Sequence, residues 1–154
     1  MTLRRSTRPA GTRWQRHVAD HHGRTAMNDA LNAWHAYVKS RDSARLLRLL
    51  HSDVVFESPV LHTPQLGSEI AFRYLDSAVS ILTRPGFHYT NEWQGTKSAV
   101  LEFETEIEGI KINGVDIMSF CSEGTQIIKF KVMVRPLKAI QLLRRLMFER
   151  MSNG

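Results

Sequence analysis

The stretch LEFETEIEGIKINGVDIMSF, residues 101–120, decides the fold class. Leu101, Phe103, Thr105 and Ile107 alternate with four glutamates, and such a period of two is typical of a β-strand with one buried face. The dipeptide Glu108-Gly109 can turn the chain, and a second strand-like run follows from Ile112. The stretch therefore predicts two antiparallel strands joined by a tight turn.

The same period of two continues on both sides of this hairpin. Phe87, Tyr89 and Trp93 alternate with polar residues before it, and a fourth run covers residues 126–135 after it. Short polar or glycine-containing turns separate the runs at residues 94–96, 108–109 and 122–124. Four successive strands with short turns predict an antiparallel meander.

Helical periodicity surrounds the meander. It starts at Met27, with Leu31, Trp34 and Val38 on one face, and a second short helix follows a cap at Asp42 or Ser43. A strand over residues 53–58 then precedes a third helix, which opens at Gly67-Ser68 and stops at residues 84–86; a closing helix covers residues 137–151. This order predicts an α+β fold with three N-terminal helices and a C-terminal helix against a curved, mainly antiparallel sheet. Such a cone leaves a cavity between helices and sheet, suited to a small molecule.

Composition fits one compact domain, and the basic charge is concentrated in the first residues. The chain has 154 residues and a net charge of +6. Residues 1–26 hold six arginines and one aspartate, so residues 27–154 are nearly neutral. We interpret residues 1–26 as a disordered basic extension, either a weak match to a mitochondrial transit peptide or a segment upstream of an internal start at Met27, and residues 27–151 as the domain. A nucleic-acid partner is not expected, because such proteins carry their basic charge on a folded face.

Membrane insertion and disulfides are not expected either. No apolar run approaches the roughly 20 residues that span a bilayer. Cys121 is the single cysteine, which rules out an internal disulfide and fits the reducing cytoplasm.

Three segments of the chain resemble a known superfamily. They are DVVFESPVLHTPQLG (53–67), NGVDIMSFCSEGTQI (113–127) and FKVMVRPLKAI (130–140). These segments and the order of elements over residues 27–150 are similar to the nuclear-transport-factor-2-like superfamily, which includes SnoaL-like polyketide cyclases and ketosteroid isomerases. The resemblance implies the cone fold, a homodimer through the open sheet face and a site in the cavity. Because this fold hosts enzymes, binding proteins and assembly modules alike, it does not by itself imply a reaction.

The resemblance to ketosteroid isomerases also implies individual roles. In that family a tyrosine on the first helix and a protonated aspartate on a later strand donate hydrogen bonds to an enolate oxygen; the matching residues here are Tyr37 and Asp116. The family's general base falls on Ser58, and an unactivated serine cannot take a proton from carbon. Glu57 is adjacent, but neighbouring strand residues point to opposite faces. His62, in the following loop, has a side chain that titrates near neutrality.

The residues themselves leave alternatives open for each candidate. Asp116 stands among apolar residues, so its carboxyl is either solvated, paired with a lysine, or in a pocket that raises its pKa. His62 is either an ordinary loop histidine or a proton carrier, and Glu57 is either a base or an ion-pair partner of Arg135. Large side chains either line a cavity or fill the core. The residues expected to line the cavity are Trp34, Ser58, Tyr74, Trp93, Met118 and Phe120.

Metal and cofactor chemistry have no support in the pattern. The row of glutamates from Glu102 to Glu108 lacks histidines at metal-ligand spacing, so we expect a charged outer or dimer-facing sheet surface. Lys129 and Lys131 share a face of the last strand and are candidates to pair with that row. The prediction is a small-molecule-binding domain, and as an enzyme a cofactor-free acid–base isomerase or cyclase acting on an apolar carbonyl compound. In that enzyme Asp116 and Tyr37 polarise an oxygen, and His62 or Glu57 moves the proton. The alternative is a non-catalytic ligand-binding or dimerisation module of the same fold.

Overall fold

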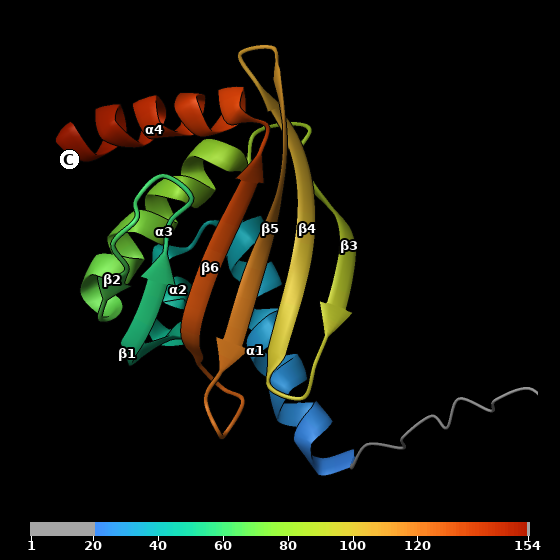
Figure 1. The fold of residues 1–154 in the computed structure, drawn as a ribbon. Helices are drawn as coiled ribbons and strands as arrows, with labels where there is room; N and C mark the ends of the chain where they lie inside the picture. Colours follow the sequence, from blue (N-terminus) through green and yellow to red (C-terminus); the bar gives the residue numbers. More distant parts are fainter. Residues whose placement is uncertain (1–20, 154) are drawn as a thin grey trace, which may run out of the picture.

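The computed structural model describes residues 21–153 and shows helices packed on a curved sheet (Figure 1). The helices are α1 (His21–Ser40), α2 (Ser43–Leu49), α3 (Ser68–Leu82) and α4 (Leu137–Ser152). The strands are β1 (Leu50–Glu57), β2 (Gln65–Leu66), β3 (His88–Gln94), β4 (Ser98–Ile107), β5 (Ile110–Phe120) and β6 (Ile127–Arg135). The predicted α+β class is confirmed.

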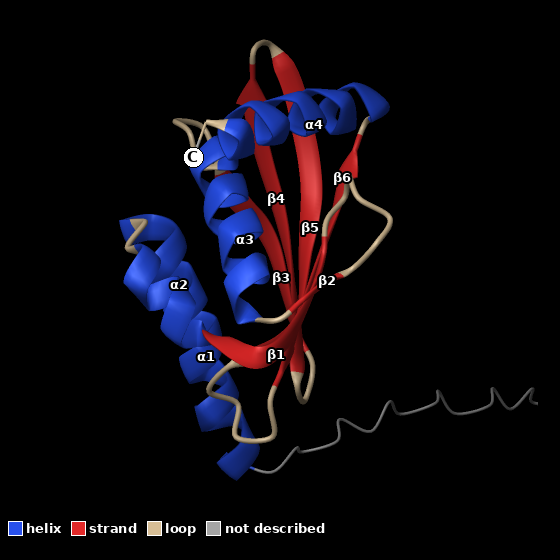
Figure 2. Ribbon diagram, turned by 90° about the vertical axis from the view of Figure 1, so that its left-hand side faces the viewer, coloured by secondary structure: helices blue, strands red, loops and turns tan. Residues whose placement is uncertain are grey.

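The six strands form one sheet in the order β2-β1-β6-β5-β4-β3. Strands β3 to β6 are the predicted antiparallel meander, and β1 adds to its β6 edge in parallel. The two-residue strand β2, which the sequence did not indicate, pairs antiparallel with β1. Figure 2 shows α1, α2 and α3 on one side of the sheet, with α4 crossing one end.

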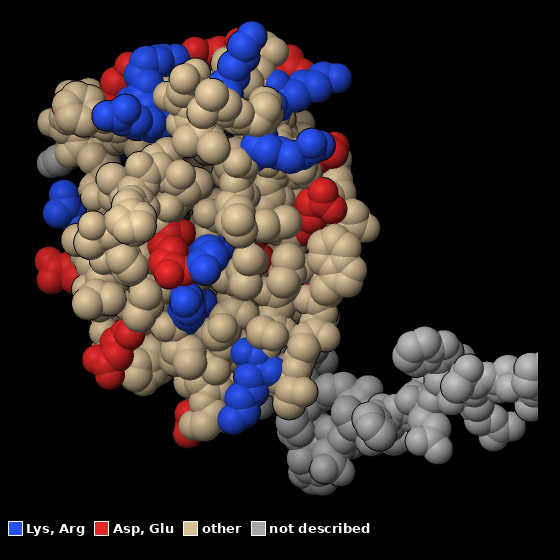
Figure 3. Space-filling view, viewed as in Figure 1, with Lys and Arg blue, Asp and Glu red and all other residues tan. Residues whose placement is uncertain are grey.

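Alternation in the sequence sorts side chains between the two faces of the sheet. On β4 the side chains of Leu101, Phe103, Thr105 and Ile107 are buried under the helices, and the glutamates between them face outward. The outer face, seen in Figure 3, has largely uncharged surface between its charged groups.

Several boundaries and pairings differ from the sequence-based predictions. Helix α1 begins at His21, ahead of the expected Met27, and the rest of the expected extension lies outside the described residues. Strand β1 begins at Leu50, ahead of Asp53, because Leu50 pairs with Ile127 and its carbonyl accepts from the side chain of Gln126. Strand β1 lies between α2 and α3, where the sequence placed a strand, and the unexpected β2 follows it there.

The expected pairing of Lys129 and Lys131 with the glutamate row is wrong. Lys131 lies 3.0 Å and Lys129 3.4 Å from Glu57 Oε2. The reason is the strand order: β6 lies next to β1, which carries Glu57, and β5 separates it from the glutamates of β4. Arg135 likewise donates to the side chain of Asn113 rather than pairing with Glu57.

No helix within residues 21–153 is long and apolar enough to cross a membrane.

Candidate functional site

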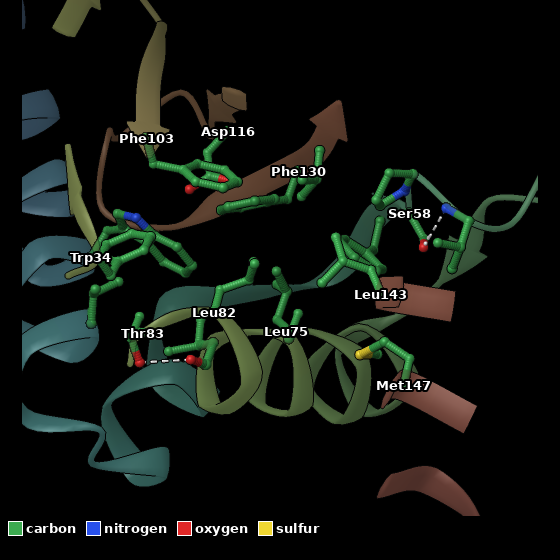
Figure 4. Close-up of a pocket in the computed structure, with 18 of the residues that line it drawn as sticks. Trp34, Ser58, Leu75, Leu82, Thr83, Phe103, Asp116, Phe130, Leu143 and Met147 are labelled. Atoms are coloured by element: carbon green, nitrogen blue, oxygen red, sulfur yellow. Dashed lines mark hydrogen bonds between the residues drawn. The ribbon is translucent and has the colours of Figure 1, made fainter. Parts of the chain in front are cut away.

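An inner cavity lies between the helices and the concave face of the sheet. Its volume is about 50 Å³, and most of the side chains around it are apolar. Figure 4 shows Trp34, Phe103 and Asp116 toward one end and Ser58, Leu143 and Met147 toward the other. Among the described residues that line the cavity, Asp116 is the only carboxylic acid and there is no histidine.

Strand β5 brings Asp116 into this apolar cavity. Inward-facing residues alternate along the strand, so Asp116 shares its face with Gly114 and Met118. Its register partners are Leu101 on β4 and Val132 on β6, and only 6% of its surface is exposed. A carboxyl group in such surroundings is costly to ionise.

Three side chains from three elements form a hydrogen-bonded chain ending at Asp116. Trp34 Nε1, on α1, donates to Tyr89 Oη, on β3, at 3.0 Å. Tyr89 Oη donates in turn to Asp116 Oδ2, also at 3.0 Å. No described residue donates to Asp116 Oδ1, so this oxygen remains available to a molecule in the cavity.

Burial controls the protonation of this chain. It raises the pKa of Asp116 to about 7, although the hydrogen bond from Tyr89 acts in the opposite direction. Burial, reinforced by the charge of Asp116, raises the pKa of Tyr89 well above its usual value. Near neutral pH, Asp116 therefore exists in both protonation states, whereas Tyr89 remains a hydrogen-bond donor.

Trp34, Ser58 and Asp116 are the expected residues that line the cavity. Ser58 Oγ accepts a hydrogen bond from the backbone N–H of Val60 at 3.2 Å, which stabilises the loop after β1. No basic group adjoins the Ser58 hydroxyl among its described hydrogen-bond partners. Ser58 is thus a polar group of the wall and not an activated base.

Tyr37 does not reach Asp116, and Tyr89 takes the place expected for it. Tyr37 lies one helical turn after Trp34 and donates to Asp76 Oδ1, on α3, at 2.9 Å. Ser43 donates to the same oxygen, also at 2.9 Å. Burial and this hydrogen bond raise the pKa of Tyr37. Tyr37 therefore joins α1 to α3 outside the cavity wall.

Glu57 and His62 also lie away from the cavity. Glu57 points to the outer face of β1, where its hydrogen bond with Lys131 lowers the pKa of its carboxyl. His62 is exposed in the loop between β1 and β2 and does not line the cavity. Neither side chain is placed to exchange a proton with Asp116 or with a molecule beside it.

A bulge in β3 accounts for the position of Trp93. The register shifts between Tyr89, opposite Phe103, and Asn91, opposite Glu102. One extra residue reverses the faces of the strand. Tyr89 consequently points into the cavity and Trp93 onto the outer face, where it is 54% exposed. The alternation in the sequence had suggested that both point the same way.

The other expected lining residues lie near the cavity without bordering it. Met118 and Phe120 are buried farther along β5, and Tyr74 packs on Phe56 with ring centroids 6.0 Å apart. Sequence reasoning missed Tyr89 and Phe87 as lining residues, although their alternation was visible. What it lacked was the pairing of β3 with β4 that aims them inward.

Among residues 29–153, whose side chains the structure describes, no three His, Cys, Asp or Glu residues are grouped so that they could hold a metal ion.

The known proteins that are similar to this chain are found among solved structures. No protein-family model and no curated protein matches the chain. Among solved structures, a steroid delta-isomerase from Pseudomonas aeruginosa is 32% identical, with a TM-score of 0.78, over 83% of this chain and 93% of that one. A bacterial protein from Silicibacter pomeroyi, described as having a cystatin-like fold, is 25% identical with a TM-score of 0.74, over 81% of this chain and 86% of that one.

A more distant structure agrees in fold alone. It is a nuclear-transport-factor-2-like protein of unknown function from Mesorhizobium loti, 17% identical with a TM-score of 0.64, over 78% of this chain and 98% of that one. The cone fold, the inward aspartate on β5 and the similarity to the steroid delta-isomerase over nearly its whole length lead to the same assignment. The chain belongs to the nuclear-transport-factor-2-like superfamily.

Proposed function

We propose that the chain binds a small, mostly apolar carbonyl compound in the inner cavity and moves a proton on it. One observation carries the proposal: a single carboxyl group, Asp116, with a pKa of about 7, stands in an apolar cavity beside a tyrosine hydroxyl. A proton carrier is most effective when its pKa is near the working pH. The similarity to a steroid delta-isomerase supports the same class of chemistry.

The proposed reaction needs one carboxylate and one hydroxyl. The Asp116 carboxylate takes a proton from the carbon next to the carbonyl group. Because Asp116 is then neutral, Tyr89 turns its hydroxyl proton from Oδ2 of Asp116 to the enolate oxygen. Protonated Asp116 then returns the proton to another carbon of the same molecule, so the double bond moves and the carboxylate is regenerated. Trp34 positions Tyr89 through its indole N–H. A hydroxyl aimed at the developing negative charge is the kind of group that lowers such a barrier.

Two observations favour the second candidate, a non-catalytic ligand-binding module. Ser58 stands where ketosteroid isomerases have their base, so Asp116 must carry the proton alone. The cavity of about 50 Å³ is also far below the roughly 300–1,000 Å³ of most ligand sites. A ligand must therefore push side chains aside, and the unbranched, half-buried Met147 at the cavity wall is suited to move.

Isomerisation of a β,γ-unsaturated ketone to its conjugated form, followed by ultraviolet absorbance, tests the proposal. We expect turnover by the wild-type chain, with kcat/KM rising with pH up to about 7 as Asp116 ionises. Asp116→Asn should lower kcat about 10²–10⁴-fold, and Tyr89→Phe about 10²–10³-fold.

The matched controls are Tyr37→Phe, Glu57→Gln and His62→Ala, whose side chains lie outside the cavity wall and should leave kcat within about twofold. Equal ketone binding by the wild-type and Asp116→Asn chains, with turnover by neither, would establish the binding module instead. Loss of activity in a control and not in Asp116→Asn would overturn the assignment of the site.

We also propose that the chain forms a homodimer through the outer face of its sheet. Trp93 and Met133 are more than half exposed there, and Val100, Val115 and Ile117 lie between them in the strand register. Large apolar side chains gathered on one face are typical of an interface.

A further inference from the structure

A second hollow, of about 450 Å³, opens at the ends of α1 and α3, and its polar lining is strongly basic. Lys39 and Arg41 come from the end of α1 and the turn after it, and Arg84 follows α3. His35 and His88 complete the basic lining. We call this hollow the basic groove.

The basic groove is separated from the inner cavity by one layer of side chains. Val38, Thr83, Phe87 and Tyr89 line both spaces. Val38 and Phe87 are only partly buried, so they can be displaced more easily than core residues. Tyr89 is also the residue that donates to Asp116. A molecule extending from the groove toward the cavity would therefore reach the proposed catalytic pair.

The positive charge of the groove is largely uncompensated. Lys39, Arg41 and Arg84 are exposed, and none forms an ion pair or a side-chain hydrogen bond with a described residue. His35 and His88, in contrast, pair with Glu92 at 2.9 Å and with Glu104 at 4.0 Å.

The dipoles of two helices offset only part of the positive charge of the groove. The C-termini of α1 and α3 both end beside the groove, and each contributes about half a negative charge. The three unpaired cations outnumber these two half charges, and the carboxylates of Glu92 and Glu104 lie against His35 and His88. Three exposed and unpaired cations that line one hollow are suited to bind an anionic group.

We propose that the basic groove holds the anionic group of the same ligand whose carbonyl oxygen reaches Tyr89 and Asp116. The substrate class is then an apolar carbonyl compound that bears a sulfate, phosphate or carboxylate group. This inference rests on the proposed function for the carbonyl end of the ligand, but the anionic end has its own residues and its own readout.

Binding of estrone and estrone sulfate to the full chain tests the inference, because both carry a ketone on an apolar body and only one carries an anionic group. We expect estrone sulfate to bind at least about tenfold more tightly at low ionic strength, and the ratio of the two affinities to shrink as salt is added.

Two triple variants with the same change of net charge make the test specific. Lys39→Met, Arg41→Met and Arg84→Met together should bring the affinity ratio to about one while leaving estrone binding unchanged. Arg48→Met, Arg73→Met and Lys138→Met, exposed cations outside the groove, should preserve the ratio. Equal affinity of the wild-type chain for the two probes, or an equal loss in both triple variants, overturns the inference.

A separate measurement distinguishes failure of this inference from failure of the proposed function. If neither steroid binds, the proposed ligand class for the cavity fails, and inorganic pyrophosphate then probes the groove alone. Shifts of the backbone amide resonances of Lys39, Arg41 and Arg84 during a pyrophosphate titration, absent in the groove triple variant, would keep the groove as an anion site. No shift at these residues would overturn it.

Discussion

Asp116 links the chemistry of this protein to its stability. Its carboxyl group is held in the folded chain with a pKa of about 7, against 3.8 for an ordinary aspartate, because burial penalises the charged form. The unfolded chain therefore releases this proton at a lower pH than the folded chain does. The free energy of unfolding must respond to pH across that interval.

We expect the stability of the wild-type chain, relative to Asp116→Asn, to decrease as pH rises from about 4 to about 7. Below the lower value both states hold the proton, and above the higher value both have lost it, so the relative stability should be level outside the interval. The total change is on the order of 4 kcal/mol. Urea unfolding of both chains at pH 4, 5.5, 7 and 8 measures it.

The wild-type and Asp116→Asn chains share all other carboxylates. The difference between their free energies of unfolding therefore reports the titration of Asp116. A flat difference between the two chains across this range, or one that rises with pH, would show that Asp116 has an ordinary or lowered pKa. The proton-shuttle mechanism would then be wrong as well.

Strands β4 and β5 pack closely at Gly114, which has no side chain. Gly114 on β5 lies opposite Phe103 on β4, whose ring lines the cavity. A Cβ atom added at Gly114 would overlap the Phe103 ring and would lie 2.9 Å from the backbone oxygen of Met133. The glycine therefore gives room to an aromatic wall of the cavity.

Gly114→Ala should lower the free energy of unfolding by roughly 2 kcal/mol, since overpacking a tight interior forces side chains and backbone to move. Chemical denaturation measures the change. Ser119→Ala, on the outer face of the same strand, is the control and should stay within about 0.5 kcal/mol of wild type. Adding Phe103→Leu should recover part of the loss in Gly114→Ala. A Gly114→Ala chain as stable as wild type would contradict the proposed contact.

The molecule as a whole presents an apolar patch on the face away from its cavity. If the proposed homodimer forms there, charges at Trp93 and Met133 must oppose it. We expect sedimentation at micromolar concentration to show a dimer for wild type and a monomer for the double variant Trp93→Asp, Met133→Asp. Phe148→Asp, a comparable change at a 75% exposed residue of α4, should leave the dimer intact. A wild-type chain that sediments as a monomer would refute the proposed interface.

The alternation of apolar and polar residues along the chain was sufficient to predict much of the fold. Period-two alternation identified β3 to β6 and predicted their antiparallel order, because each turn is short enough to be decided by adjacent residues. It also identified Asp116 as a carboxyl group among apolar residues, but left open whether that group is solvated, paired with a lysine or in a pocket. The aspartate in an apolar strand is visible in the sequence alone, as is a serine at the position of the family's base, Ser58.

The partners of these residues depend on contacts between distant segments. Because of the bulge in β3, Tyr89 points inward and Trp93 points outward. The alternation of residues along β3 does not predict this bulge. The insertion of β6 between β1 and β5 brings Lys129 and Lys131 to Glu57 on the outer face of the sheet. The sequence therefore determined the class of fold and the central carboxyl group, because side-chain alternation is a property of neighbours along the chain. Tertiary structure alone decided that Tyr89, and not Tyr37, donates a hydrogen bond to Asp116. The reason is that strand register and sheet order arise only when segments far apart in the chain meet.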